Sequence, residues 1–186
     1  DVGVGIGDEA KGLMEDNEIC SCSIGIELTG RALPFIKKNR VYDTEYGITV
    51  SDGAGGKIDE NKINSITRTG IDVSLGGHPR VYGNKIYNCK GAGLCVRDNG
   101  MGEYERNNIY NNVGHSIEVV ASGKDNPEKL VMKRNNMYDG DACGLMIRNN
   151  SGGEYFSNII KNHSGAGIWI DDFSDPTADR NEIMYC

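Results

Sequence analysis

Apolar residues recur along this chain at a fixed long period and alternate with polar residues at a short one. A segment of the form Gly-apolar-x-apolar returns about every 22 or 23 residues, and residues 25–28 and 47–50 are early copies. Alternation with a period of two is typical of β-strands, and no stretch keeps the spacing of an amphipathic helix. Each repeat therefore predicts two or three short strands separated by turns.

An asparagine two residues before an apolar side chain marks every repeat. The steps between successive asparagines are 22, 22, 23, 23, 28, 23 and 23 residues. The marked positions are Asn17, Asn39, Asn61, Asn84, Asn107, Asn135, Asn158 and Asn181. One repeat cannot bury its own apolar side, but repeats stacked at about 4.8 Å share a continuous core. The pattern predicts an all-β fold, a right-handed single-stranded parallel β-helix (a β-solenoid) of about eight three-sided rungs.

These asparagines are expected to be structural. Stacked at one corner of the solenoid, each side-chain amide can donate a hydrogen bond to the side-chain carbonyl of the next. Asparagine also tolerates the backbone conformation of turns. We interpret the eight residues as a structural ladder without a catalytic role.

One step of the repeat is five residues too long. The surplus between Asn107 and Asn135 lies in a polar segment, which predicts an insertion loop at residues 121–128. The remaining pattern predicts one β-helix domain over residues 1–186. Because both ends lie inside a repeat, we expect a fragment of a longer solenoid, with end-to-end self-association as an alternative partner for the exposed strand edges.

Composition and charge exclude some function classes. The 26 glycines and 19 asparagines agree with many turns. With 27 acidic and 20 basic residues the net charge is −7, so no basic face for nucleic acid is expected. No apolar run approaches the roughly 18 residues that span a membrane.

The cysteines bear on the cellular compartment. No two of the six are placed to form a disulfide, and their spacing resembles no zinc site. Unpaired thiols favour a reducing environment, which predicts a cytoplasmic or nuclear location. An extracellular or periplasmic location is the alternative if a signal peptide has been removed.

The outward positions of the Gly-apolar-x-apolar strand form the predicted binding face. It consists of Glu27, Asp72, Arg97, Glu118, Arg148, Trp169 and Asp171. Exposed tryptophan and arginine are frequent in binding hot spots, and a glycan could stack on the indole or a basic peptide could pair with the acids. The alternative is an ordinary solvated sheet face.

No catalytic or metal site is predicted, and no cofactor. The outward acids lie two rungs apart, about 9.6 Å, which is too far for a shared metal or an acid–base pair. His78, His115 and His163 occupy different positions of the repeat, and His78, which precedes a proline in a turn, is interpreted as structural.

Four tyrosines follow the apolar residue of the asparagine motif. They are Tyr42, Tyr87, Tyr110 and Tyr138. We expect a partial aromatic stack on a second face, which would stabilise the solenoid; a ligand platform is the alternative.

The segments Gly-His-Pro-Arg-Val-Tyr-Gly-Asn-Lys-Ile-Tyr (77–87) and Lys-Gly-Ala-Gly-Leu-Cys-Val-Arg-Asp-Asn-Gly-Met-Gly (90–102) resemble known repeats. They are similar to β-helix repeats of the pectate-lyase-like superfamily. More narrowly, they resemble the CASH-type repeats of F-box-only ubiquitin-ligase subunits and of periplasmic NosD-like proteins. Polygalacturonase-type motifs are missing, apart from the pair Asp171-Asp172.

The resemblance implies a substrate-recognition solenoid within a larger protein. We therefore predict a non-catalytic recognition or scaffold domain that binds a protein partner through the outward face, and we do not expect an enzyme. The alternative is a carbohydrate-active module of the pectate-lyase-like superfamily, which would be a polysaccharide lyase, hydrolase or epimerase, or a glycan-binding module.

Overall fold

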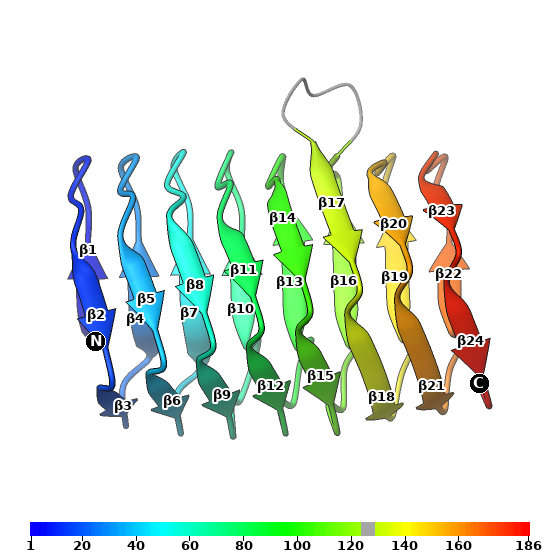
Figure 1. Cartoon of the computed structure of the whole chain (residues 1–186), viewed down its shortest axis with the longest axis horizontal. Helices are drawn as coiled ribbons and strands as arrows, with labels where there is room; N and C mark the ends of the chain where they lie inside the picture. The colour runs from blue at the N-terminus through cyan, green and yellow to red at the C-terminus, as the bar shows by residue number, and fades with distance from the viewer. Residues whose placement is uncertain (124–128) are drawn as a thin grey trace.

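Stacked coils make up the whole of the described chain. The computed structural model describes residues 1–123 and 129–186, and every regular element in these ranges is a β-strand. Figure 1 shows eight coils standing side by side, with the chain advancing by one coil per repeat from the N-terminal to the C-terminal end. The predicted β-solenoid of about eight rungs is confirmed.

Each coil contributes one strand to each of three parallel sheets, here named A, B and C. Sheet A contains β1 (Val2–Ile6), β4 (Ile24–Leu28), β7 (Tyr46–Val50), β10 (Ile71–Val73), β13 (Leu94–Arg97), β16 (Ile117–Val120), β19 (Leu145–Arg148) and β22 (Ile168–Ile170). Sheet B contains β2 (Leu13–Glu15), β5 (Phe35–Lys37), β8 (Lys57–Asp59), β11 (Arg80–Tyr82), β14 (Gly102–Glu105), β17 (Leu130–Lys133), β20 (Glu154–Phe156) and β23 (Thr177–Asp179). Sheet C contains β3 (Glu18–Cys20), β6 (Arg40–Tyr42), β9 (Lys62–Asn64), β12 (Lys85–Tyr87), β15 (Asn108–Tyr110), β18 (Asn136–Gly140), β21 (Ile159–His163) and β24 (Glu182–Met184).

The core is a set of apolar columns that run along the solenoid axis. Ile48, Ile71 and Leu94 are partners on successive strands of sheet A, and all three are buried. Sheet C contributes a column that includes Ile63 and Ile86. Burying each such side chain contributes about 1.5–3 kcal/mol. Stacking, rather than any single rung, therefore holds the fold together.

The asparagine ladder occupies the corner between sheets B and C. Across its seven steps, each Nδ2 donates to the Oδ1 of the next asparagine over 2.9–3.2 Å. Each backbone N–H donates to the same oxygen, as Asn61 does to Asn84 over 2.8 Å. The predicted ladder is confirmed.

The left-handed backbone of this corner belongs to the residue before each asparagine, not to the asparagine itself. Asp16, Lys38 and Glu60, for example, have φ values between 54° and 59°. The expectation that the ladder asparagines adopt the turn conformation was wrong. They instead satisfy the N–H and C=O groups that the turn leaves unpaired.

The long step of the repeat leaves the ladder in register. Asn107 Nδ2 lies 2.9 Å from Asn135 Oδ1, although 28 residues separate them. The extra residues fall in the sequence between the end of β16 at Val120 and the start of β17 at Leu130. Of the predicted loop 121–128, residues 124–128 lie outside the described part of the chain.

The tyrosine stack is shorter than predicted. Tyr87, Tyr110 and Tyr138 are stacked, with neighbouring ring centroids 4.9 Å apart in both pairs and interplanar angles of 5° and 7°. Tyr42 is not part of the stack, because Asn64 stands between it and Tyr87 in the register of sheet C. The hydroxyl of Tyr42 instead donates to a carboxylate of the preceding rung.

Candidate functional site

The predicted binding face lies on the outer side of sheet A. Glu27, Asp72, Glu118 and Trp169 stand in one column of that sheet, as expected from the repeat. Trp169 is half exposed, and its Nε1 donates to Asp171 Oδ2 over 3.4 Å.

Two acids of this face are already neutralised by arginines of the following rung. Arg97 Nε lies 3.2 Å from Asp72 Oδ2, and Asp72 is only 6% exposed. Arg148 donates to Glu118 Oε1 through Nε at 3.1 Å and through Nη2 at 2.9 Å. These carboxylates are therefore occupied and do not present free charge to a basic partner.

Cys95 lies between the two ion pairs, and it is buried. Burial, followed by the carboxylates of Asp72 and Glu118, raises the pKa of its thiol to about 12. A thiol with so high a pKa is almost fully protonated at neutral pH, which makes it a poor nucleophile.

The predicted residues are too widely spread to form one compact site. Glu27 lies on β4 and Trp169 on β22, six strands further along sheet A, which is about 29 Å at the usual strand spacing. Within the described ranges, no three His, Cys, Asp or Glu side chains are grouped to hold a metal ion. The same part of the chain has no helix long and apolar enough to cross a bilayer. Protein binding through the sheet A face stays a prediction.

A cleft on sheet B is the better candidate site. It has a volume of about 450 Å³. Its lining comprises Gly12, Leu33, Pro34, Phe35, Gly56, Lys57, His78 and Arg80. We call it the sheet B cleft. Sequence reasoning missed it, although Phe35, Lys57 and Arg80 occupy the same outward position in three successive repeats.

The lining of the cleft combines apolar and cationic side chains. Phe35, Lys57 and Arg80 are partners on β5, β8 and β11. Leu33 is 46% exposed beside them. The ammonium of Lys57 lies 5.8 Å from the centre of the Phe35 ring, close enough for a cation–π interaction.

Glycine allows the backbone to approach closely at one edge of the cleft. Gly56 has φ of +88°, and a Cβ there would overlap the carbonyl oxygen of Pro34. A side chain at this position would therefore both strain the backbone and push the two rungs apart.

The two cations of the rim are not equivalent. Arg80 Nη1 donates to both carboxylate oxygens of Asp59, over 3.0 and 3.1 Å. Burial raises the pKa of Asp59, and Arg80 opposes that shift. Lys57 forms no salt bridge in the described ranges, so it is the cation that remains available to a ligand.

His78 is half-buried in the same cleft. Its Nδ1 lies 3.2 Å from the carbonyl oxygen of Gly76. If Nδ1 carries the proton and donates to that carbonyl, Nε2 is left as an acceptor. Its contact with the backbone agrees with the structural role predicted for His78, and its place in the cleft makes it a candidate ligand-binding residue that the sequence pattern did not reveal.

Comparisons with known proteins concern the fold. A family model described as "Right handed beta helix region" matches residues 1–128 and 125–186. No curated protein matches the sequence.

Three solved structures of the periplasmic alginate epimerase AlgG resemble the chain, each with 16% identity. The unmodified epimerase has a TM-score of 0.78, and a threonine-to-asparagine mutant has a TM-score of 0.83. Each of these two matches covers 98% of this chain and 47% of the other chain. An aspartate-to-alanine mutant has a TM-score of 0.71, with 93% and 50% covered. The chain thus spans about half the length of these structures, and at this identity the likeness concerns the fold alone.

Proposed function

We propose, from the premise that the chain belongs to the right-handed β-helix family, that it is a carbohydrate-active module that binds an acidic polysaccharide in the sheet B cleft. The observation that carries the proposal is Lys57, an exposed cation without a salt bridge in the described ranges, beside the half-buried Phe35 and the exposed Leu33 in a chain of net charge −7. Clefts of this kind combine apolar area with a few polar groups that orient the ligand.

Each part of the cleft has a role in this proposal. The apolar face of a sugar ring packs on Phe35 and Leu33, because aromatic and aliphatic side chains offer large contact areas. A sugar carboxylate pairs with the ammonium of Lys57, and Nε2 of His78 accepts a hydrogen bond from a sugar hydroxyl. A neutral glycan would leave Lys57 without its partner, so the cleft favours uronic acids.

The structural neighbours support the same class of ligand. Their name describes an epimerase of alginate, which is an acidic polysaccharide, and they share the solenoid over nearly the whole of this chain. They are also periplasmic by name. We therefore propose a periplasmic location, which was the alternative to the cytoplasmic or nuclear prediction.

The test is titration calorimetry with alginate and polygalacturonate oligosaccharides, with a dextran oligosaccharide as the neutral probe. We expect saturable binding of an acidic oligosaccharide, weakened about tenfold or more by Lys57→Glu and by Phe35→Ala. Lys129→Glu is the matched control, since it changes the net charge equally and breaks only an exposed ion pair with Glu154. Equal binding by wild type and Lys57→Glu would refute the proposal.

The same samples report on catalysis. Incubation with the polymers, followed by NMR of the products, detects unsaturated or epimerised uronates. Products formed by wild type and not by Lys57→Glu would add an activity to the binding function.

A further inference from the structure

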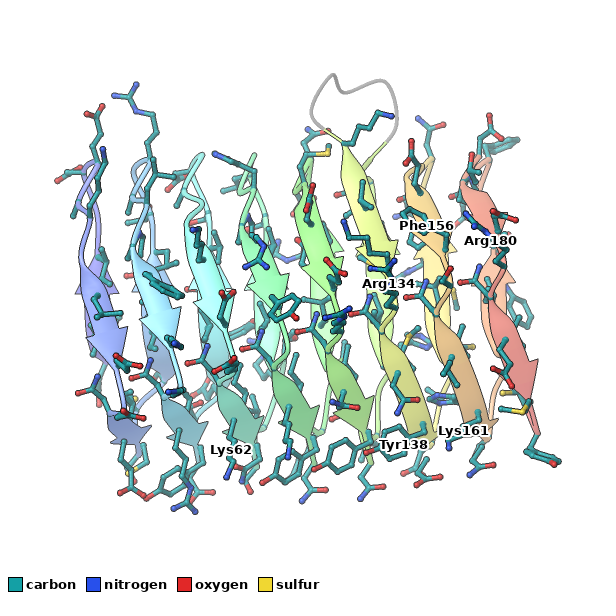
Figure 2. All side chains as sticks on the ribbon, in the orientation of Figure 1. Lys62, Arg134, Tyr138, Phe156, Lys161 and Arg180 are labelled. Atoms are coloured by element: carbon teal, nitrogen blue, oxygen red, sulfur yellow. The ribbon has the colours of Figure 1, made fainter. Side chains whose placement is uncertain are left out.

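The outer face of sheet C carries a row of positive charges. Arg40, Lys62 and Lys85 are partners on β6, β9 and β12, and all three are exposed. The strand spacing of about 4.8 Å places them at regular intervals along the solenoid axis. In Figure 2, Lys62 points outward from the lower edge of the view, where sheet C lies.

Two of the three cations in this row have no acidic partner in the described ranges. Elsewhere a cation typically meets an acid of a neighbouring rung, as Arg80 meets Asp59 and Arg148 meets Glu118. Lys62 and Lys85 form no ion pair in the described ranges, and Arg40 pairs only with Glu18 of the preceding rung. Like charges directly opposite one another destabilise a sheet. Lys62 and Lys85 are therefore uncompensated cations in a chain of net charge −7, whereas Glu18 balances the charge of Arg40.

Hydrogen-bonding side chains continue the row without charge. The next two positions of the same column are Asn108 and Asn136. Asn136 Nδ2 donates to Asn108 Oδ1 over 3.4 Å, while Asn136 Oδ1 is buried without a hydrogen-bond partner in the described ranges. The column thus offers three cations followed by two amides.

The tyrosine stack runs beside this column. Tyr87, Tyr110 and Tyr138 are half-buried, and each stands two residues after a member of the column. Asn64 takes the place of a ring beside Lys62, and the Tyr87 ring is therefore not covered by a tyrosine on that side. On each of these rungs, the residue of the column is a cation or an asparagine. The residue two positions later is a tyrosine or an asparagine.

We propose that the sheet C face binds an extended strand of acidic polysaccharide laid along the solenoid axis. Carboxylates pair with Lys62 and Lys85, beside the Glu18-bound Arg40, and hydroxyls bond to the amides and tyrosines that follow. The rung spacing is comparable to the length of one sugar residue, so successive sugars meet successive rungs. The class of ligand rests on the proposed function, but the surface is separate from the sheet B cleft and would anchor the polymer independently of it.

Charge density favours this occupant over nucleic acid. The row holds three cations and then turns to neutral amides, whereas a duplex presents a dense and continuous line of phosphates. The chain's net charge of −7 adds repulsion against such a ligand. A polyuronate has fewer charges per unit length and hydroxyls for the amides to bond.

The experiment uses the full chain with two probes, polymeric alginate and polygalacturonate, in affinity electrophoresis and calorimetry. The double variant Lys62→Glu/Lys85→Glu should weaken polymer binding about tenfold or more. The control Lys129→Glu/Arg180→Glu makes the same change of net charge at two exposed ion pairs and should alter binding by no more than about twofold. Binding should also weaken with salt.

Three results would overturn the proposal: unchanged binding by Lys62→Glu/Lys85→Glu, an equal loss in the control, or a DNA duplex that binds through the row while both glycans do not. The variant Lys57→Glu separates the two surfaces. If Lys57→Glu abolishes binding while the row variant does not, the cleft alone is the site. If the row variant abolishes binding while Lys57→Glu does not, the sheet C face is supported and the proposed function of the cleft is refuted.

Discussion

His163 fills the space that Gly140 leaves open in the preceding rung. The two residues are partners on β21 and β18, and a Cβ at position 140 would lie 2.7 Å from His163 Nδ1. His163 is 4% exposed, so the imidazole has no room to move toward the solvent without opening the corner. The glycine and the histidine therefore act as a complementary pair of small and large residues.

Gly140→Ala should destabilise the protein by about 1–3 kcal/mol, because the added methyl overlaps the imidazole. In the double variant Gly140→Ala/His163→Ala, the methyl group occupies part of the vacated space. The loss should then be smaller than the sum of the two single losses, as measured by urea denaturation. Gly5→Ala is the control, since a Cβ there would meet nothing closer than 4.0 Å. Strict additivity would contradict the pairing.

Stability should fall as the pH drops below about 6.5. Burial lowers the pKa of His163 and of His115. The unfolded chain takes up these protons near pH 6.5, whereas the folded chain does so only at lower pH. The unfolded state thus binds more protons in this window, which favours unfolding. Above about 6.5 both states are neutral and the effect is absent.

Urea titrations at several pH values measure the slope of the unfolding free energy against pH. His163→Asn should make this slope less steep. Asparagine is a suitable replacement because Asn112 already occupies the equivalent corner of an earlier rung. An unchanged slope in His163→Asn would exclude His163 as one of its sources.

Asn84→Ala should cost several kcal/mol of unfolding free energy. Asn84 Nδ2 donates to Ile58 O over 2.7 Å and to Asn107 Oδ1 over 3.0 Å, and its Oδ1 accepts from Asn61. Alanine leaves these buried groups unpaired, at about 1–3 kcal/mol each. Asn17→Ala, at the exposed end of the ladder, should cost far less because water replaces its hydrogen bonds. Equal losses in the two variants would contradict the ladder's role.

Iodoacetamide at pH 8 should separate the cysteines into two groups. Burial raises the pKa of Cys89 and of Cys95 to about 12, so both should stay unmodified in the native protein. Cys20 and Cys186 are exposed and should react. Peptide mass spectrometry measures the extent of alkylation at each site, with urea-unfolded protein as the control. Native Cys95 reacting as fast as Cys20 would show that its rung opens readily.

Lys85→Gln should stabilise the protein by about 0.2–1 kcal/mol, because it removes a like charge opposite Lys62. Thermal unfolding at low ionic strength measures the change, which should shrink as salt is added. Lys129→Gln, which removes the ion pair with Glu154, is the control and should not stabilise. A destabilised Lys85→Gln would mean that the row is already neutralised.

The fold could be predicted because residues with the same local role recur at a regular spacing along the chain. Every ladder asparagine bonds to its counterpart one rung away, so spacing alone located the corner. The side chains on the outer faces do not recur in this regular way. Nothing in the spacing required Arg97 to turn back onto Asp72, or Asn64 to interrupt the tyrosines. The sheet B cleft escaped prediction because its shape depends on how closely Gly56 and Pro34 approach, which is a property of the backbone.

The long step of the repeat also makes the solenoid a scaffold for engineering. The ladder bond from Asn107 to Asn135 is as short as those across the ordinary steps, so the stack accepts a change of chain length at the corner between sheets A and B. A foreign peptide or a fluorophore-bearing segment grafted between β16 and β17 would be displayed from a fixed rung, at known heights relative to both the cleft and the cationic row.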